Sequence, residues 1–386
     1  MKKLVIITTH PIQYYAPLFK LLAKECNLIV YYTLGLGNEK YDKGFEQNIE
    51  WDVDLLEGYN YRFLKNSAKN PSLNHFMGIK NHNLIKKINE CSPDAILIYG
   101  WAYYSHLNIM RHFKNKIPIW FRGDSTLTDN QSWFKKELRK AFLKWVYSKV
   151  DLAFYVGKAN KQYFKSFGLN DEKLIYLPHA IDNNRFSQDK KAEAEAIRNK
   201  YNVAKSDILV LFAGKFEKKK SPDLLLDAFM SLQEPNAHLL FVGNGPMEKQ
   251  LKEKAHQHSL NNPSFKIYFM DFQNQSNMPA IYHTCDLFCL PSQGPGETWG
   301  LAVNEAMACG KAILVSDKVG CARDLINNKI NGEIFESKHF ADLSKKLNSL
   351  VSNKNELNKM GAESAQIIKN YTFDIQVEQL ITVLNA

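Results

Sequence analysis

Two glutamates, Glu297 and Glu305, stand eight positions apart around the start of a predicted helix. Gly294, Gly296 and Gly300 precede that helix, whose start offers unpaired backbone N–H groups and a positive dipole end that suit a phosphate. The two carboxylates could therefore hold opposite ends of one ligand whose phosphates lie between them. This arrangement favours a sugar linked to a nucleoside diphosphate. The alternative, from this segment alone, is an ordinary strand–loop–helix unit with two solvated glutamates.

Two lysines, Lys215 and Lys220, follow the predicted strand Ile208–Ala213, which Gly214 ends. Cations at the carboxyl end of a strand can neutralise a diphosphate, including the charge that develops as it leaves a sugar carbon. Lysine does this as a point charge, without the bidentate fork of arginine. The alternative is an exposed basic turn.

Two further strand ends in the second half have residues suited to a nucleotide. Gly243 follows one strand in a GxG pattern, which by itself often marks only a tight turn. Met270 and Asp271 lie in the loop Phe269–Phe272 after the next strand, where the backbone could frame a nucleobase. These residues can contact the same ligand as the lysines and glutamates only if the fold brings these strand ends together.

Apolar runs alternate with helical segments along the whole chain, which predicts parallel sheets with crossover helices. The strand candidates are Lys3–Thr8, Leu28–Tyr32, Ala95–Tyr99, Ile117–Phe121, Leu152–Tyr155, Leu174–Leu177, Ile208–Ala213, Ala237–Val242, Lys266–Phe269, Leu287–Leu290, Ala312–Val315 and Gly332–Phe335. The polar stretch Asp182–Asn202 separates the two series and is a candidate hinge. We therefore predict two doubly wound domains, with ligands at the carboxyl ends of strands and in the cleft between the domains.

Composition narrows the class of protein. A length of 386 residues suffices for two cores, and the six cysteines show no metal-site spacing, which favours free thiols in a reducing compartment. The N-terminal segment is expected to be a first strand rather than a signal peptide, and no window reaches the roughly 18 apolar residues of a membrane span. These observations predict a cytoplasmic protein.

The net charge of +10 lies entirely in the first half, residues 1–185. Its densest patch is the predicted helix 133–149, which carries Lys135, Lys136, Arg139 and Lys140 together with aromatic residues. A basic amphipathic helix suits an anionic membrane surface, and the alternative is a solvated basic face over a packed apolar one. No recognised nucleic-acid motif accompanies the basic half, so we expect no nucleic-acid partner.

Taken in order, the motifs resemble a known family. The sequence GKF…K, then VGNGP, then two glutamates in an E-x7-E pattern and GKAILVSDKVGCARDLI resemble the retaining family-4 glycosyltransferases of the α/β GT-B fold. The resemblance runs from about Asp151 to the C-terminus and includes LIYLPHAID at the domain junction. It implies Rossmann-like domains over residues 1–185 and 186–370, with a terminal helix over 371–386 that crosses back to the first domain.

The resemblance implies roles for the matching residues. Lys220 and Lys215 hold the donor diphosphate, although the family usually has arginine at the position of Lys215. Glu297 faces the donor sugar near the anomeric carbon, and Glu305 accepts hydrogen bonds from the ribose hydroxyls. These four residues form the expected catalytic and ribose-binding set.

Seven further residues complete the expected donor site. Trp299, Gly300 and Leu301 match the segment whose backbone N–H groups reach phosphate, with tryptophan where phenylalanine is more frequent. The other donor-binding candidates are Gly214, Gly243, Met270 and Asp271.

The first half departs from the family pattern. The loop from Thr8 to Phe19 contains no glycine, so His10 and Gln13 are candidates to replace backbone contacts by side-chain contacts. The segment IPIWFRGDST offers Arg122 and Asp124 where the family often has a histidine. These four residues are the candidates for the acceptor side, and a structural ion pair between Arg122 and Asp124 is the alternative.

The sequence thus predicts a retaining glycosyltransferase for cell-surface glycans, such as lipopolysaccharide, capsule, exopolysaccharide or glycolipid. The expected partners are a UDP- or GDP-sugar, a glycan or lipid-linked acceptor and the inner face of the cell membrane, with no cofactor or metal. The triplet Asp52–Asp54 superficially resembles a metal-binding DxD but is expected to be an exposed strand edge. A nucleotide-sugar 2-epimerase and a non-catalytic partner in a glycan-assembly complex are the alternatives.

Overall fold

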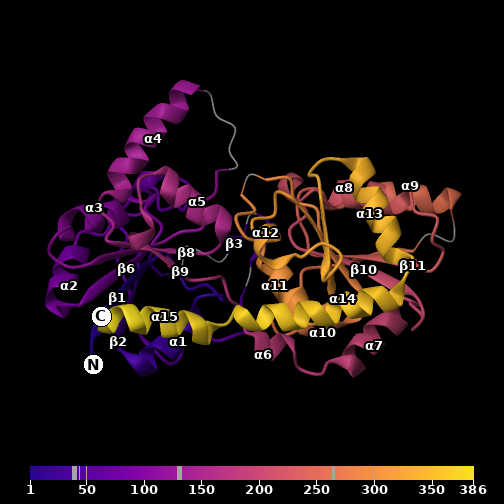
Figure 1. Ribbon diagram of the computed structural model, residues 1–386, viewed down its shortest axis with the longest axis horizontal. Coiled ribbons are helices and arrows are strands. Elements are labelled where there is room, and N and C mark those ends of the chain that lie inside the picture. Colours follow the sequence, from indigo (N-terminus) through magenta and orange to yellow (C-terminus); the bar gives the residue numbers. More distant parts are fainter. Residues whose placement is uncertain (37–40, 43, 49, 128–132, 263–265, 295) are drawn as a thin grey trace. The chain divides into compact units, whose positions relative to one another are not determined.

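The computed structural model describes residues 1–36, 41–42, 44–48, 50–127, 133–262, 266–294 and 296–386. The chain divides into two units, each built around a parallel sheet of its own (Figure 1). The first unit comprises residues 1–40, 53–179 and 373–386, and the second comprises residues 41–52 and 180–372. Residues 182–202, the candidate hinge, lie in the second unit and include two helices, Asn183–Phe186 and Lys191–Lys200.

The sheet of the first unit has the strand order β5-β2-β1-β6-β7-β8-β9, with every neighbouring pair parallel. Its strands are β1 (Lys3–Thr8), β2 (Asn27–Tyr32), β5 (Asn60–Phe63), β6 (Ala95–Tyr99), β7 (Ile119–Arg122), β8 (Leu152–Tyr155) and β9 (Leu174–Tyr176). The central strands β6 and β7 are buried at every position, as expected for a sheet that is covered on both faces. The carboxyl ends of β1, β6 and β7 therefore lie at one edge of this sheet.

Helices from both ends of the sequence pack in the first unit. They are α1 (Ala16–Glu25), α2 (Leu84–Cys91), α3 (Tyr104–Phe113), α4 (Trp133–Tyr147), α5 (Lys158–Ser166) and α15 (Phe373–Asn385), with short 3-10 turns at Phe76–Gly78 and Asp171–Lys173. The C-terminal α15 lies beside α1, and Gln376 on α15 donates a hydrogen bond to the carbonyl of Pro178 (Figure 1). The terminal helix therefore belongs to the first unit although the residues just before it belong to the second.

The sheet of the second unit has the strand order β12-β11-β10-β13-β14-β15 and is also parallel. Its strands are β10 (Ile208–Ala213), β11 (Ala237–Val242), β12 (Ile267–Met270), β13 (Leu287–Leu290), β14 (Ala312–Ser316) and β15 (Gly332–Phe335). The strand order reverses between β10 and β13. Such a reversal opens a crevice at the carboxyl ends of the strands, where doubly wound sheets bind their ligands.

The helices of the second unit connect these strands. They are α6 (Asn183–Phe186), α7 (Lys191–Lys200), α8 (Pro222–Met230), α9 (Glu248–Asn261), α10 (Met278–Thr284), α11 (Leu301–Ala308), α12 (Ala322–Leu325), α13 (Phe340–Val351) and α14 (Lys354–Ile367), with 3-10 turns at Lys218–Lys220 and Ile368–Asn370. A small antiparallel pair, β3 (Tyr41–Asp42) and β4 (Gln47–Asn48), also belongs to this unit.

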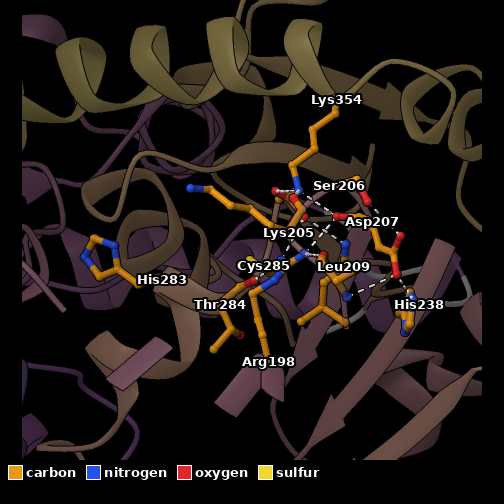
Figure 2. A network of polar contacts seen from close by, with 12 residues as sticks. Arg198, Lys205, Ser206, Asp207, Leu209, His238, His283, Thr284, Cys285 and Lys354 are labelled. Carbon is orange, nitrogen blue, oxygen red and sulfur yellow. Dashed lines mark hydrogen bonds and ion pairs between the residues drawn. The ribbon is translucent and has the colours of Figure 1, made fainter. Parts of the chain in front are cut away.

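A network of charged side chains fastens the starts of the strands in the second unit (Figure 2). Arg198 and Lys354 each place a nitrogen 3.1 Å from a carboxylate oxygen of Asp286, just before β13. Asp207, just before β10, lies 2.9 Å from Nε2 of His238 in β11. Since these groups lie at the starts of the strands, this network is structural and is separate from the carboxyl ends of the strands.

The sequence predicted no membrane-spanning helix and free cysteine thiols. No helix in the described ranges is both long enough and apolar enough to cross a membrane. All six cysteines are free, and all but Cys91 are buried.

Candidate active site

The loops after β10 and β13 bring Lys220 and Glu297 together. The lysine nitrogen lies 2.5 Å from Oε2 of Glu297, and the Ser292 hydroxyl donates to the same oxygen at 3.0 Å. The two side chains are only 17% and 10% exposed. Because β10 and β13 are the neighbours at which the strand order reverses, this ion pair lies at the expected ligand-binding edge of the sheet.

Backbone geometry explains how both side chains reach this position. Ser221 takes a left-handed conformation with φ of 49° and is followed by Pro222 at the start of α8, so the chain turns sharply just after Lys220. Gly300 has φ of 99° at the start of α11, a conformation that favours glycine. A Cβ atom at Gly300 would also lie 2.9 Å from a methyl carbon of Val319. These two turns therefore direct the loops toward each other.

The glycines after β10 and β11 allow the two loops to pack backbone against backbone. Gly243 has φ of 135°, and a Cβ atom there would lie only 2.1 Å from the carbonyl oxygen of Gly214. Lys215 follows Gly214, and its ammonium nitrogen lies 5.0 Å from the centroid of the Phe45 ring. The structure thus places Gly214, Lys215 and Gly243 at the same edge of the sheet as Lys220.

The side chains of Glu305 and Trp299 are almost completely buried. Glu305 on α11 is 3% exposed and accepts a hydrogen bond of 2.8 Å from the Tyr282 hydroxyl. Trp299 is also 3% exposed, and its indole N–H donates to Asn304 at 2.8 Å. The Trp299 side chain therefore stabilises the start of α11, whose first residue is Leu301. The backbone of Trp299 lies in the loop before this helix.

The predicted nucleobase loop is held by a residue that sequence reasoning missed. Met270 ends β12, and Asp271 follows it. The side-chain oxygen of Asn244 accepts from the backbone N–H of Phe272 at 2.6 Å, and its amide group lies 3.4 Å from Oδ1 of Asp271. The available signal was the position of Asn244 between Gly243 and Gly245 at a strand end.

The acceptor-side candidates Arg122 and Asp124 line a cavity in the first unit. It has a volume of about 220 Å³ and lies at the carboxyl ends of β1, β6 and β7. Arg122 is 3% exposed and donates to the carbonyl of Leu177 at 2.7 Å. Its Nε and the hydroxyl of Tyr99 have no hydrogen-bond partner within the part of the chain that the structure describes. Buried polar groups of this kind suit a polar ligand.

His179 is a second residue in this cavity that the sequence did not indicate. Its Nε2 lies 3.9 Å from Oδ2 of Asp124, and it is 4% exposed. Burial, with the positive charge of Arg122 as a smaller cause, lowers the pKa of His179 to about 3. The imidazole is therefore neutral at physiological pH. Its position in LIYLPHAID, three residues after the last strand of the unit, was the available signal.

His10 and Gln13 lie in the same first-unit loop but are not brought to the cavity wall. Thr9 and Ile12 line the cavity instead, while both candidates are only half-buried. Nδ1 of His10 lies 2.8 Å from the Thr9 hydroxyl. The glycine-free loop therefore contributes to the cavity through the neighbours of the predicted residues.

Asp52 and Asp54 are exposed, but their triplet lies outside any strand, contrary to our expectation of a strand edge. Asp54 accepts the backbone N–H groups of Leu56 and Glu57 at 2.9 and 3.0 Å, which closes its own turn. Asp52 instead accepts the backbone N–H of Ser276 at 3.1 Å. The two carboxylates thus hold different partners. No metal-binding cluster of histidine, cysteine, aspartate or glutamate occurs among the residues with described positions.

Comparison with known proteins finds a family match within the second unit. A model of the family described as Glycosyl transferases group 1 matches residues 193–367. The chain carries a glycosyl transferases group 1 domain. This domain lies wholly within the second unit and contains Lys215, Lys220, Glu297 and Glu305.

Relatives of the glycosyltransferase domain cover different shares of the chain. Mannosylfructose-phosphate synthase of Agrobacterium fabrum is 31% identical over 169 residues, which are 41% of this chain and 36% of that protein. A Campylobacter jejuni N,N'-diacetylbacillosaminyl-diphospho-undecaprenol alpha-1,3-N-acetylgalactosaminyltransferase is 25% identical over 325 residues, covering 80% of this chain and 82% of that protein. The chain thus spans about a third of the first relative and most of the second.

Solved structures show the fold of the whole chain. The crystal structure of Anabaena HepE in complex with UDP matches with a TM-score of 0.75 and 16% identity, and all of both chains is covered. A sucrose-phosphate synthase from Thermosynechococcus elongatus matches with a TM-score of 0.73 and 14% identity, covering 100% of this chain and 98% of that chain. The fold is therefore GT-B, with the glycosyltransferase domain as its second Rossmann-like unit.

Proposed function

We propose that this chain moves a sugar from a UDP- or GDP-linked donor to an acceptor hydroxyl, with retention of the anomeric configuration. The observation that carries the proposal is the Lys220–Glu297 pair at the reversal of the strand order, within the residues that match the glycosyltransferase family. A mostly buried cation beside a carboxylate suits a ligand that is anionic at its diphosphate and rich in hydroxyls at its sugar.

The chemistry follows from those groups. The bond between the sugar C1 and the diphosphate oxygen breaks, and its electron pair remains on that oxygen. Lys220 and Lys215 stabilise this charge, so the reaction needs no metal. The acceptor oxygen forms the new bond to C1 on the same face, and its proton passes to the leaving phosphate oxygen. Glu297 orients the donor sugar and places its negative charge beside C1, where positive charge develops in the transition state, and Glu305 holds the ribose.

The first-unit cavity is the proposed place for the acceptor. Arg122, Asp124, Tyr99 and His179 offer both donors and acceptors of hydrogen bonds, which is what sugar hydroxyls require. Among the relatives, the Campylobacter protein is named for a diphospho-undecaprenol-linked acceptor, and a Corynebacterium glutamicum relative for a phosphatidylinositol monomannoside. These names support a glycan or lipid-linked acceptor, a hexosyl or N-acetylhexosaminyl donor sugar and a role in making cell-surface glycans.

A lipid-linked acceptor agrees with the outer face of α4. Leu138, Phe142 and Trp145 are 75%, 42% and 40% exposed, while Leu143 and Val146 on the same helix are buried. The side chains of Lys135 and Lys136 lie outside the described residues, but Lys140 and Lys144 are exposed. Apolar and cationic side chains on one helix suit the cytoplasmic face of an anionic membrane.

The membrane contact has a test of its own. The Lys140→Glu, Lys144→Glu variant should lose co-sedimentation with vesicles containing anionic phosphatidylglycerol. A charge-matched control, Lys345→Glu with Lys369→Glu, should retain it. If both variants sediment equally with the vesicles, the lysines of α4 do not contact the membrane.

The activity is tested by incubating the pure protein with a panel of UDP- and GDP-sugars and measuring the released nucleotide. Slow hydrolysis to UDP or GDP, with the sugar released in its original anomeric form, supports the proposal. A changed sugar on an intact nucleotide would indicate the 2-epimerase instead. Binding without any reaction would indicate a non-catalytic partner.

A further inference from the structure

Five residues from the early part of the chain pack on the second unit: Gly44, Phe45, Glu50, Trp51 and Asp52. We call them the docking residues. The flanking residues 1–40 and 53–179 belong to the first unit, so this short segment is the part of the early chain that joins the second. The segment therefore contacts the glycosyltransferase domain although it lies far outside the residues that match the family.

Two of the docking residues place aromatic rings on Phe272, beside the predicted nucleobase loop. The centroids of Phe45 and Phe272 lie 4.7 Å apart, and those of Trp51 and Phe272 lie 6.4 Å apart, both edge to face. Such pairs stabilise one another beyond their buried area. The orientation of the Phe272 ring, directly after Met270 and Asp271, is therefore set by residues from another part of the sequence.

Polar contacts fix the same segment to the loop that follows Phe272. The side-chain amide of Asn274 donates to the carbonyl of Glu50 at 2.6 Å. Asp52 accepts the backbone N–H of Ser276 and a second, short hydrogen bond from the Ser276 hydroxyl. Asp52 is thus the anchor of the segment, because its carboxylate takes two hydrogen bonds from one residue.

The segment also reaches the predicted diphosphate site. The ammonium group of Lys215 lies over the Phe45 ring. A Cβ atom at Gly245 would lie 2.9 Å from the carbonyl oxygen of Gly44, so the glycine loop after β11 packs tightly against the segment. The docking residues therefore touch the loops after β10, β11 and β12, from the diphosphate end to the nucleobase end of the expected donor.

We propose that the docking residues form a wall of the donor site and determine its affinity for the nucleobase of a nucleoside diphosphate. This inference rests on the proposed function. The aromatic group of Phe45, Trp51 and Phe272 provides a surface against which a base can stack, and stacking accepts any base with a π-face. Asp52 is a positioning residue that holds this surface in place through Ser276.

The test compares Asp52→Ala with Asp54→Ala by isothermal titration with UDP, GDP and inorganic diphosphate. Asp54 is a matched control, because its carboxylate closes only its own turn. We expect Asp52→Ala to weaken binding of the nucleotide that the wild type prefers by about tenfold, because the binding free energy must then also hold in place a segment that has lost its hydrogen bonds to a charged group. Binding of inorganic diphosphate should stay the same, and Asp54→Ala should bind both like the wild type.

A second variant keeps the test independent of Asp52. Phe45→Ala should lower nucleotide affinity to a similar extent, whereas Phe45→Leu, which retains an apolar contact without a ring face, should be intermediate. The midpoint of thermal unfolding of each variant checks that the fold is intact.

Three outcomes would overturn the inference. If Asp52→Ala binds nucleotide like the wild type, the docking residues are not part of the site. If Asp52→Ala also weakens the binding of inorganic diphosphate by the same factor, the substitution disturbs the whole site and does not act through the base. If the wild type binds neither UDP nor GDP, the proposed function fails together with the inference. The first two outcomes, in contrast, overturn only the inference.

Discussion

The ammonium nitrogen of Lys220 lies 2.5 Å from Oε2 of Glu297, although the residues are 77 positions apart in the sequence. Both side chains are largely removed from water, so their opposite charges attract each other more strongly than they would on an exposed surface. In the proposed reaction, the donor diphosphate shares Lys220 with Glu297. On this proposal, binding of the leaving group to Lys220 affects the position of Glu297, the carboxylate that is expected to face the sugar.

Glu297→Gln should lower kcat for donor hydrolysis by roughly 10²–10³ while changing KM little, because the lost charge acts mainly in the transition state. Glu363→Gln, an exposed substitution on α14, serves as a control and should keep wild-type kinetics. Steady-state assays of released nucleotide give both constants. A rise in KM alone would mean that Glu297 only binds the donor.

Gly243→Ala should lower the free energy of unfolding by about 3 kcal/mol and abolish nucleotide binding, because the added Cβ meets the Gly214 carbonyl. Gly296→Ala is the matched control: its φ is also positive, but no atom lies within 4 Å of the new Cβ. We expect it to lose only about 1 kcal/mol. Urea unfolding measures both, and equal losses would contradict close packing of the two loops.

Asp286→Asn should destabilise the second unit by about 3 kcal/mol, because Arg198 and Lys354 would then lack their carboxylate in a largely buried position. Glu253→Gln, which removes an exposed pair with Lys249, should change stability by less than about 0.5 kcal/mol. Calorimetric unfolding of the two variants distinguishes them. Similar small losses would show that the network in Figure 2 contributes little.

Acid should destabilise the first unit below about pH 6.5. Burial lowers the pKa of His10 and of His106 to about 4 and that of His179 to about 3. The unfolded chain, with histidine pKa values near the ordinary 6.5, therefore binds more protons than the folded chain as the pH falls from 6.5 toward 4. Stability must fall over that range, by up to about 1.4 kcal/mol per pH unit for each histidine.

His106→Gln tests this pH dependence. His106 is fully buried between the Thr33 hydroxyl and the carbonyl of Gly100. The variant should show a shallower fall in unfolding free energy between pH 7 and pH 5 than the wild type, whatever its stability at pH 7. His256→Gln, an exposed substitution, should keep the wild-type slope. Parallel slopes for all three proteins would show that His106 does not contribute.

The strands of both sheets were largely predictable because they are short apolar runs buried on both faces. The strand β10, for example, is buried at all six positions and has the predicted bounds Ile208–Ala213. The strand β5 was missed, since Asn60–Phe63 alternates between exposed and half-buried residues at the edge of its sheet. Such a strand lacks the continuous apolar run by which the other strands were predicted.

The site was predictable only where it depends on strand ends. Lys220 and Glu297 were expected near one ligand because both follow strands, and the adjacent positions of β10 and β13 place them in contact. His179 and Asn244 were missed because a single polar residue at a strand end carries no periodic signal. The docking of Asp52 on Ser276 was also missed, since 224 positions separate the two residues.

We propose that the edge of the sheet at Lys220 and Glu297 binds the diphosphate of a sugar nucleotide. Isothermal titration of UDP and GDP into the wild type and into Lys220→Ala is the direct test. We predict that the wild type binds at least one of the two nucleotides and that Lys220→Ala weakens this binding by at least about tenfold, the effect of losing a charge-assisted hydrogen bond. Equal binding by the wild type and Lys220→Ala would show that Lys220 does not bind the diphosphate.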